Sequence, residues 1–342
     1  MNKQSHLVVY SDPQWALGAD GQIDPGRASL ERDALGPDVN IRLGVRHGGR
    51  FVPSGELLEE ALAGADALVI YRTEITPRLV EILKGRCKVV ARQGVGIDNL
   101  NAPLLQAANI WAFNVPDYCV DEVVAHTLGM AFAIERGIVV QDRLLKAGRW
   151  DIFAGGRPRR LANLTLGIIG MGRIGRSLSA KARPFYSRVV AFDPYVHGDL
   201  MTGYGARHAA TLRELLEQSD VVSLHPALTP ETRHIINNQT IRFMKDGAVL
   251  INNARGALVE PEAVLAALRE GRLRGYGSDV FSPENPHDTP ANREILSFEN
   301  VVVTSHRAFL SDEAERSQRL RVAEGVLEVL QHGRPPTFGR VA

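Results

Sequence analysis

Three short segments of the sequence carry polar side chains that can bind anions and exchange protons. Residues 252–256 contain Arg255, residues 279–284 contain Glu284, and residues 305–309 contain His306. Each segment follows an apolar run that predicts a β-strand. Because the carboxyl ends of the strands in an open α/β sheet face the binding crevice, these side chains can converge although they are far apart in the sequence.

A glycine-rich turn at residues 170–175 has the G-x-G-x-x-G spacing of a dinucleotide-binding site. It follows a predicted strand over 164–169, and a predicted helix over 173–182 begins from it. The first helical residues, Arg173 and Ile174, present unpaired N–H groups that can donate hydrogen bonds to phosphates. The alternative is a glycine turn in an α/β protein that binds no nucleotide.

Each glycine of this turn has a physical purpose if a dinucleotide binds there. Gly170 permits the tight turn, Gly172 leaves room for the pyrophosphate, and Gly175 lets the helix approach the strand. Asp193 ends the next predicted strand, where it can accept hydrogen bonds from the adenosine ribose. A 2′-phosphate would be repelled there, and the next three residues include no arginine to receive it. We therefore expect NAD rather than NADP.

A dinucleotide turn combined with an arginine, a carboxylate and a histidine meets the demands of hydride transfer to a 2-oxo acid. That reaction needs a clamp for the substrate carboxylate and a proton for the carbonyl oxygen. It also needs a nicotinamide at hydride distance in a dry cleft. The sequence therefore predicts an oxidoreductase, and it requires no metal because the arginine and the histidine cover the Lewis-acid and proton roles.

Apolar runs alternate with helix-period segments throughout the chain, which is typical of parallel sheets covered by helices. In the first third, strands are predicted at 7–10, 39–43, 67–71, 88–91 and 110–114, with helices at 55–62, 77–83 and 102–108. The second series has strands at 164–169, 189–192, 221–224, 248–252, 275–279 and 301–304. Six such strands match a doubly wound nucleotide-binding sheet.

We expect an α/β protein with two doubly wound domains, in which a Rossmann NAD-binding domain is inserted in a flavodoxin-like substrate domain. The substrate domain is predicted to comprise 1–113 and 308–342, and the NAD-binding domain 114–307. One long helix is predicted over 120–147 and is ended by Gly148 as a C′ glycine. A final helix over 311–331 is expected to return to the first domain.

Composition excludes several other classes of protein. The 342 residues suit two domains, and no apolar run reaches the length of a bilayer span. The two cysteines, Cys87 and Cys119, lie far apart, which argues against a disulfide framework and favours the cytoplasm. The net charge of +1, with no basic stripe, argues against nucleic acid and membrane surfaces as partners.

Longer motifs surround these candidates. They are residues 92–99, Asn114-Val115-Pro116 with Glu122, the glycine turn with Asp193, His225-Pro226 through Thr232, and the three polar segments. In this order, and over nearly the whole chain, the sequence resembles the D-isomer-specific 2-hydroxyacid dehydrogenase family. Residues 117–122 and 309–311 look most like the C-terminal-binding-protein branch and its bacterial relatives.

The resemblance implies a role for each polar side chain. Arg255 would clamp the substrate carboxylate and polarise the carbonyl, a task that suits its planar fork. His306 would be the general acid in reduction and the base in oxidation, and Glu284 would orient it and favour its protonated form.

The resemblance also implies cofactor and substrate contacts. Asp279 would approach the nicotinamide, and the remaining cofactor residues would be Thr127, His225, Pro226, Thr232, Asn253 and Ala254. Backbone N–H groups of Gly94, Val95 and Gly96 would bind the substrate carboxylate, and Arg72 lies in another loop that touches substrate in the family. Arg92 would reach toward the substrate and Phe309 would form an apolar wall beside it. A salt bridge for Arg92 and a core position for Phe309 are nearly equal alternatives.

Two positions depart from the family pattern. Ser305 stands where a proline commonly precedes the histidine, and Arg307 stands where a small residue is usual. Arg307 can bind a second acidic group, lower the pKa of His306, or point into solvent. Arg72 and Arg92 together suggest a doubly anionic substrate, such as a phosphorylated or dicarboxylic acid.

A second hypothesis is an NAD(H)-sensing binding protein of the corepressor type, because the corepressors keep the same three polar residues. Another Rossmann enzyme, such as an alanine dehydrogenase, lacks support at the catalytic motifs. The helix predicted over 120–147 carries a broad apolar surface, part of which is expected to pack on a second copy in a homodimer.

Overall fold

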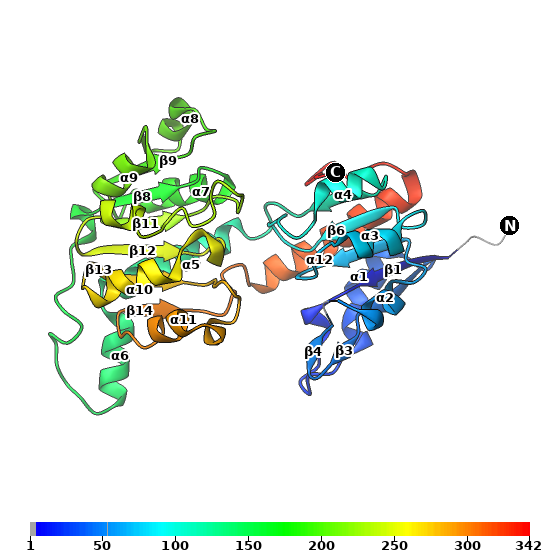
Figure 1. Cartoon of the computed structure of the whole chain (residues 1–342), viewed down its shortest axis with the longest axis horizontal. Coiled ribbons are helices and arrows are strands. Elements are labelled where there is room, and N and C mark those ends of the chain that lie inside the picture. Colours follow the sequence, from blue (N-terminus) through cyan, green and yellow to red (C-terminus); the bar gives the residue numbers. More distant parts are fainter. Residues whose placement is uncertain (1–4, 53) are drawn as a thin grey trace. The chain divides into compact units, whose positions relative to one another are not determined.

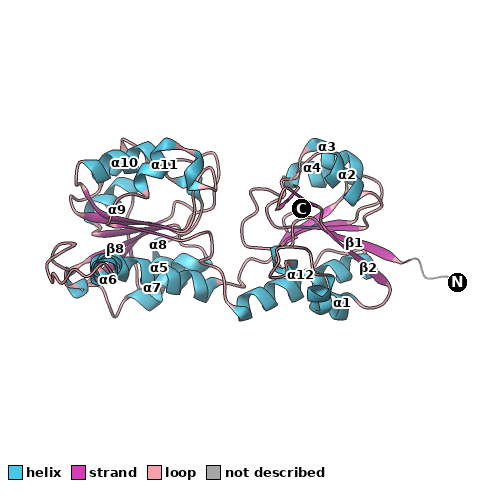
Figure 2. Ribbon diagram, turned by 90° about the horizontal axis from the view of Figure 1, so that it is seen from below, coloured by secondary structure: helices cyan, strands magenta, loops and turns pink. Residues whose placement is uncertain are grey.

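The structure is a computed structural model that describes residues 5–52 and 54–342, and its chain divides into two compact units (Figure 1). One unit consists of Met1–Tyr118 and Ser311–Ala342, and the other of Cys119–Leu310. Each contains a parallel β-sheet with helices on both faces (Figure 2). The expected α/β class with two doubly wound sheets is confirmed. The divisions at 118/119 and 310/311 lie a few residues after the predicted boundaries at 113/114 and 307/308.

The first unit has a five-stranded parallel sheet with the order β2-β1-β5-β6-β7. The strands are β1 (His6–Tyr10), β2 (Val39–Leu43), β5 (Ala67–Ile70), β6 (Val89–Arg92) and β7 (Trp111–Asn114). This is the flavodoxin-like order, and all five predicted strands are present. A small hairpin of β3 (Arg46–His47) and β4 (Arg50–Phe51) was not predicted, because two-residue strands leave no periodic pattern.

Helices cover both faces of this sheet (Figure 2). On one face lie α2 (Glu56–Leu62), α3 (Pro77–Leu83) and α4 (Ala102–Ala107), and on the other α1 (Ser29–Leu35) and α12 (Asp312–His332). Ser311 caps the amino end of the final helix α12, since its hydroxyl accepts a hydrogen bond from the Ala314 N–H at 2.9 Å. It buries Val322, Val326 and Val329 against this sheet, which confirms the expected return of the chain.

The second unit has a seven-stranded parallel sheet with the order β10-β9-β8-β11-β12-β13-β14. The strands are β8 (Thr165–Ile169), β9 (Arg188–Phe192), β10 (Arg207–His208), β11 (Val221–Leu224), β12 (Ala248–Asn252), β13 (Leu273–Ser278) and β14 (Val301–Val303). The first six strands follow the dinucleotide-binding order. From β8 to β10 successive strands are added toward one edge of the sheet, and from β11 onward they are added toward the other edge, so the strand order reverses between β8 and β11. The six predicted strands are confirmed, and the two-residue β10 was missed.

Two helical layers enclose this sheet. One contains α9 (Leu212–Gln218), α10 (Pro261–Arg269) and α11 (Pro290–Ile295), and the other α5 (Val120–Glu135), α6 (Ile138–Lys146), α7 (Arg173–Ala182) and α8 (Gly198–Gly203). Both layers bury aliphatic side chains against nearly continuous apolar strands, as expected of a parallel sheet that is covered on both faces.

The prediction of one helix over 120–147 is wrong. The helix ends at Glu135, and α6 begins at Ile138 with its axis bent by 63°. Gly137 lies at the break with φ +64°, a left-handed conformation that glycine adopts without steric cost. The apolar pattern concealed the break because it is helical on both sides. The predicted role of Gly148 is confirmed, since it follows α6 with φ +77°.

Over residues 5–52 and 54–342, every individual helix is too short or too polar to cross a membrane. The bent pair α5 and α6 meets the requirements of length and composition only when the two helices are taken together.

Candidate active site

The glycine turn connects β8 to α7 and is shaped by close backbone contacts. Gly170 has φ +93°, and a Cβ there would lie 2.6 Å from the Pro226 nitrogen. A Cβ on Gly175 would lie 2.0 Å from the Gly170 carbonyl oxygen. A Cβ on Gly172 would meet no protein atom within 4 Å. Packing therefore demands glycine at 170 and 175, whereas the space beside Gly172 is open to a ligand.

The loop after β11 meets this turn where the strand order reverses. The His225 N–H donates to the Ile169 carbonyl at 2.8 Å, and its Nε2 lies 2.8 Å from the Ser223 hydroxyl. Burial lowers the pKa of His225 to about 4, so the imidazole is neutral at pH 7. Thr232 closes the loop by donating its hydroxyl proton to the Ala227 carbonyl at 2.6 Å.

Asp193 follows β9, and its carboxylate is held beside the glycine turn. Its Oδ2 accepts the Met171 N–H at 2.8 Å, and its Oδ1 accepts the Tyr195 N–H at 2.9 Å. An open turn of backbone amides next to a fixed carboxylate fits the pyrophosphate and ribose of a dinucleotide.

His306 lies in the loop after β14, where it pairs with Glu284. The His306 Nδ1 is hydrogen-bonded to the Glu284 carboxylate. The backbone of His306 has φ +55°, which is unusual for a residue other than glycine and indicates local strain. Its N–H donates to the Asp279 carbonyl at 2.7 Å, and its ring packs edge-on against Phe309 with centroids 6.4 Å apart.

The Asp279 carboxylate holds the whole turn of residues 304–308. Its Oδ1 accepts the Arg307 N–H at 2.9 Å and the Thr304 hydroxyl, and its Oδ2 accepts the Ala308 N–H at 2.8 Å. Asp279 is 2% exposed. Its contacts are therefore those of an anchor for the His306 turn, and its predicted approach to the nicotinamide stays a prediction.

Arg255 follows β12, the strand next to β13. Its carbonyl accepts from the Asn252 side chain at 2.9 Å, and its Nη1 donates to the Ala254 carbonyl at 2.8 Å. A Cβ on Gly256 would lie 2.0 Å from the Phe281 carbonyl carbon, so this turn packs directly on the segment that leads to Glu284.

Two predicted cofactor residues, Thr127 and Asn253, also lie together. The Asn253 Nδ2 donates to the Thr127 hydroxyl at 3.0 Å, and this hydroxyl donates to the Val123 carbonyl at 2.7 Å. A helix residue is thereby connected to the loop after β12. Within the second unit, the structure thus brings together three predicted groups: His306 with Glu284, Thr127 with Asn253, and the glycine turn with His225 and Pro226.

In the first unit, Arg72 and Arg92 share one aromatic ring. Their guanidinium carbons lie 5.5 Å and 5.3 Å from the centroid of Tyr71. The Asp12 carboxylate holds the adjacent loop by accepting the N–H groups of Tyr71, Arg72 and Thr73 at 2.8, 2.5 and 3.1 Å. Sequence reasoning singled out the loop of residues 71–73 but missed Asp12 and the contact of the Tyr71 ring with the two arginines. The available signal was an aspartate just after the first predicted strand.

The loop of Gly94, Val95 and Gly96 begins directly after β6. Gly94 has φ +148°, and a Cβ there would collide with the Arg92 guanidinium. Arg92 is 9% exposed and donates from Nη1 to the Gln93 carbonyl at 2.8 Å. The Gln93 side chain accepts from Trp15 at 3.2 Å and donates to Gln318 at 3.4 Å, so the start of this loop is fixed from both sides.

Comparison with known proteins agrees with this fold. A family model described as D-isomer specific 2-hydroxyacid dehydrogenase, NAD binding domain, matches residues 128–308. A D-3-phosphoglycerate dehydrogenase of Methanocaldococcus jannaschii is 35% identical over 281 residues, which cover 81% of this chain and 52% of that protein. This chain therefore spans about half the length of that relative.

Two further proteins match over most of their length. A glyoxylate reductase of Thermofilum pendens is 33% identical over 291 residues, which cover 84% of both chains. The crystal structure of D-lactate dehydrogenase from Aquifex aeolicus, complexed with NAD and lactic acid, superposes with a TM-score of 0.81. Its sequence is 27% identical, and the match covers 96% of both chains.

Together with the fold and the glycine turn, these matches define a 2-hydroxyacid dehydrogenase, an oxidoreductase that acts on CH–OH groups with NAD(P). The chain belongs to the D-isomer specific 2-hydroxyacid dehydrogenase family.

Proposed function

We propose that the protein interconverts a small, doubly anionic 2-oxo acid and its D-2-hydroxy acid, with Arg255, Glu284 and His306 as the catalytic residues. The observation that carries the proposal is the His306–Glu284 pair on a turn that a buried carboxylate anchors at the end of β14. A strained histidine with an acidic partner is typical of a general acid and base.

The pairing of His306 with Glu284 supports Nε2 as the nitrogen that transfers the proton. Because Nδ1 is bonded to Glu284, the proton must leave from or arrive at Nε2. Reduction then proceeds with Nε2 donating to the carbonyl oxygen, and Glu284 stabilises the imidazolium that is the donor. Oxidation uses the same atoms in reverse. Arg255 binds the substrate carboxylate through its planar fork and polarises the carbonyl.

The bound cofactor would supply or accept the hydride. The N–H groups of the turn 170–175 would hold its pyrophosphate, and Asp193 would accept hydrogen bonds from the ribose. The carboxylate of Asp193 disfavours a 2′-phosphate, which supports NAD as the preferred cofactor. Thr127, Asn253, Ala254 and the loop from His225 to Thr232 are proposed to complete the cofactor site.

The first unit is proposed to be the substrate domain and the second the NAD-binding domain. Arg72 and Arg92, stacked on Tyr71, support a second anionic group on the substrate, either a phosphate or a carboxylate. Backbone N–H groups of Gly94, Val95 and Gly96 are proposed to receive the carboxylate next to the reacting carbonyl.

A panel of 2-oxo acids, followed by NADH absorbance, tests this function. We expect faster turnover of phosphorylated or dicarboxylic 2-oxo acids than of neutral aliphatic ones. The variant His306→Gln should lose at least about 1000-fold in kcat while its Kd for NADH stays unchanged. Near-normal activity of His306→Gln would rule out the assigned proton donor. Turnover of aliphatic substrates alone would refute the doubly anionic class.

We further propose that the protein is a homodimer. Most of the apolar surface predicted on 120–147 is core, since Val123, Val124, Met130 and Ile134 are buried. The exposed apolar side chains instead lie on α6 and the loop after it: Ile138, Leu145, Trp150, Ile152 and Phe153. Such a cluster is typical of an interface.

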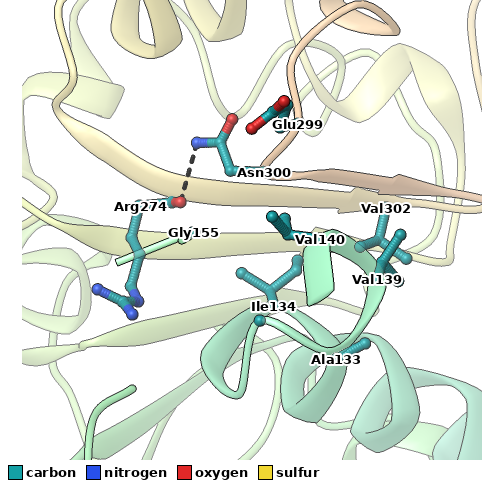
Figure 3. A pocket seen from close by; sticks show the side chains of 10 residues that line it. Ala133, Ile134, Val139, Val140, Gly155, Arg274, Glu299, Asn300 and Val302 are labelled. Atoms are coloured by element: carbon teal, nitrogen blue, oxygen red, sulfur yellow. Dashed lines mark hydrogen bonds between the residues drawn. The ribbon is translucent and has the colours of Figure 1, made fainter. Parts of the chain in front are cut away.

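A cavity of about 370 Å³ adjoins the start of α6, between that helix and the amino ends of β13 and β14 (Figure 3). Val139, Val140 and Val302 line it, together with the polar residues Glu299 and Asn300.

We expect the double variant Trp150→Glu, Leu145→Glu to convert a dimer to a monomer in light scattering, whereas Asp142→Asn on α6 should not. A monomeric wild-type protein would contradict the dimer.

The finer resemblance to the C-terminal-binding-protein branch stays a prediction, and so does an NAD(H)-sensing role. Residues 117–122 support the resemblance to this branch. Two experiments separate an enzyme from a sensor. One is an assay of the purified protein with 2-oxo acids, and the other is a pull-down of binding partners with NADH present and absent. A cytoplasmic location is proposed from the cysteine content, because the two cysteines, Cys87 and Cys119, lie far apart in the sequence and are both buried.

A further inference from the structure

His126 on α5 lies behind the His306 turn, and neither the glycine turn nor the catalytic motifs include it. Its Nε2 is 2.9 Å from the Thr304 hydroxyl and 3.9 Å from the Asp279 carboxylate. The helix is packed tightly under β13, since a Cβ on Gly277 would lie 3.4 Å from the Met130 Cβ. His126 therefore reaches the site from a rigid element of the core.

The hydrogen bonds around Thr304 have a defined direction. An ionised carboxylate can only accept, so the single hydroxyl proton of Thr304 is donated to Asp279. The Thr304 oxygen is then left as an acceptor toward His126. The proton between them must therefore be carried by His126 Nε2, which sets the tautomer of its neutral ring.

This chain of bonds ends on the turn that carries His306. The Asp279 carboxylate that accepts the hydrogen bond of the Thr304 hydroxyl also accepts those of the Arg307 and Ala308 N–H groups. The turn has a cost, because His306 adopts φ +55°. A donor on α5 that fixes Thr304 thereby limits the positions that Asp279 and the turn can take.

We propose that His126 is a positioning residue, which acts through Thr304 and Asp279 to hold the His306 imidazole in its reactive position. The inference rests on the proposed role of His306. His126 performs this role as a neutral donor: burial lowers its pKa, the Asp279 charge opposes this shift, and Arg307 adds to it. A neutral amide of the same reach can replace it, because Gln and His both place Nε2 four bonds from Cα.

The experiment compares His126→Leu with His126→Gln in the intact protein. We expect kcat for 2-oxo acid reduction to fall roughly tenfold in His126→Leu and to stay within about threefold of wild type in His126→Gln. The KM for NADH should change less than about twofold in both variants, since neither touches the cofactor turn. His332→Leu, on the exposed end of α12, is the matched control and should behave as wild type.

A second readout does not depend on turnover. Imidazole ¹⁵N NMR of the labelled protein, with the His126 signals identified by their loss in His126→Gln, should show Nε2 protonated and Nδ1 bare at pH 7. The inference is overturned by the opposite tautomer, by wild-type kcat in His126→Leu, or by a defect that glutamine does not relieve. Absence of turnover in the wild-type protein would instead refute the proposed function, and the NMR result would still decide the tautomer.

Discussion

In both units a buried carboxylate holds a loop at the carboxyl end of the sheet, but the two loops carry side chains of different chemistry. In the first unit, Asp12 follows β1 and binds the backbone of the loop after the neighbouring strand β5. In the second, Asp279 follows β13 and binds the loop after the neighbouring strand β14. Both carboxylates are buried. The loops they hold present Arg72 in one unit and His306 in the other.

The difference lies in the backbone conformation that each carboxylate supports. Asp12 is fixed by the Ser11 hydroxyl, which donates to its Oδ1 at 2.7 Å, and it accepts three consecutive N–H groups. It leaves the backbone of its loop in ordinary conformations. Asp279 is likewise fixed by a hydroxyl, that of Thr304, but it supports a left-handed residue at His306. A residue that binds a substrate charge tolerates small displacements, whereas a residue that transfers a proton requires close positioning. The anchor that supports a strained backbone therefore lies where the proposed proton transfer occurs.

The largest effect is expected from Asp279→Ala. Removal of the carboxylate leaves the half-buried N–H group of residue 307 and the buried N–H group of residue 308 without their acceptor and releases the His306 turn. We expect kcat/KM for 2-oxo acid reduction to fall at least about 100-fold, with a loss of unfolding free energy of about 2 kcal/mol or more in urea. Asp246→Ala removes an exposed carboxylate and is the control. Retention of wild-type kcat/KM would show that the turn holds itself.

A smaller effect is expected from Asp12→Ala. The loop that carries Arg72 would lose its anchor, and this loop is proposed to bind substrate rather than to react with it. The KM for a doubly anionic 2-oxo acid should rise roughly tenfold, while kcat changes less than about threefold. Steady-state kinetics with the wild type and Arg72→Ala measured in parallel checks this. If kcat falls and KM does not, the two anchors serve the same purpose and the comparison above is wrong.

The smallest effect concerns His225, whose pKa is lowered by burial. Its pKa in the folded protein, about 4, lies below the ordinary value of 6.5. The unfolded chain therefore takes up the proton first as the pH falls, so the stability contributed by neutral His225 is complete above pH 6.5 and is lost toward pH 4. Urea unfolding at pH 7 and pH 5 should show this decline, and His225→Gln should reduce it. An unchanged pH dependence in the variant would mean that other groups titrate there.

Much of the fold follows from local sequence patterns. The strands and the helix of residues 173–182 were predicted because apolar periods and the glycine spacing reflect steric rules that act within a few residues. The break at Gly137 was missed because the same helical period continues on both sides of it. The hairpin of β3 and β4 and the short strand β10 were missed because two residues make no period.

The candidate site divides in the same way. The glycine turn and the segments of Arg255, Glu284 and His306 could be recognised, because each has a characteristic type and spacing of residues. The anchors could not. Asp12 binds N–H groups about 60 residues away in sequence, and His126 meets Thr304 across 178 positions. No local pattern encodes such a bond, since the partner group is a backbone amide or a common hydroxyl.

The sequence by itself determined which residues are able to bind a dinucleotide, clamp a carboxylate and exchange a proton, because these capacities belong to the side chains and to short turns. The family resemblance already implied that Glu284 orients His306. Only the tertiary structure decided which carboxylate supports the strained backbone of His306 and which histidines are kept neutral. Those outcomes depend on burial and on the pairing of neighbouring strands, and both arise only when distant segments pack together.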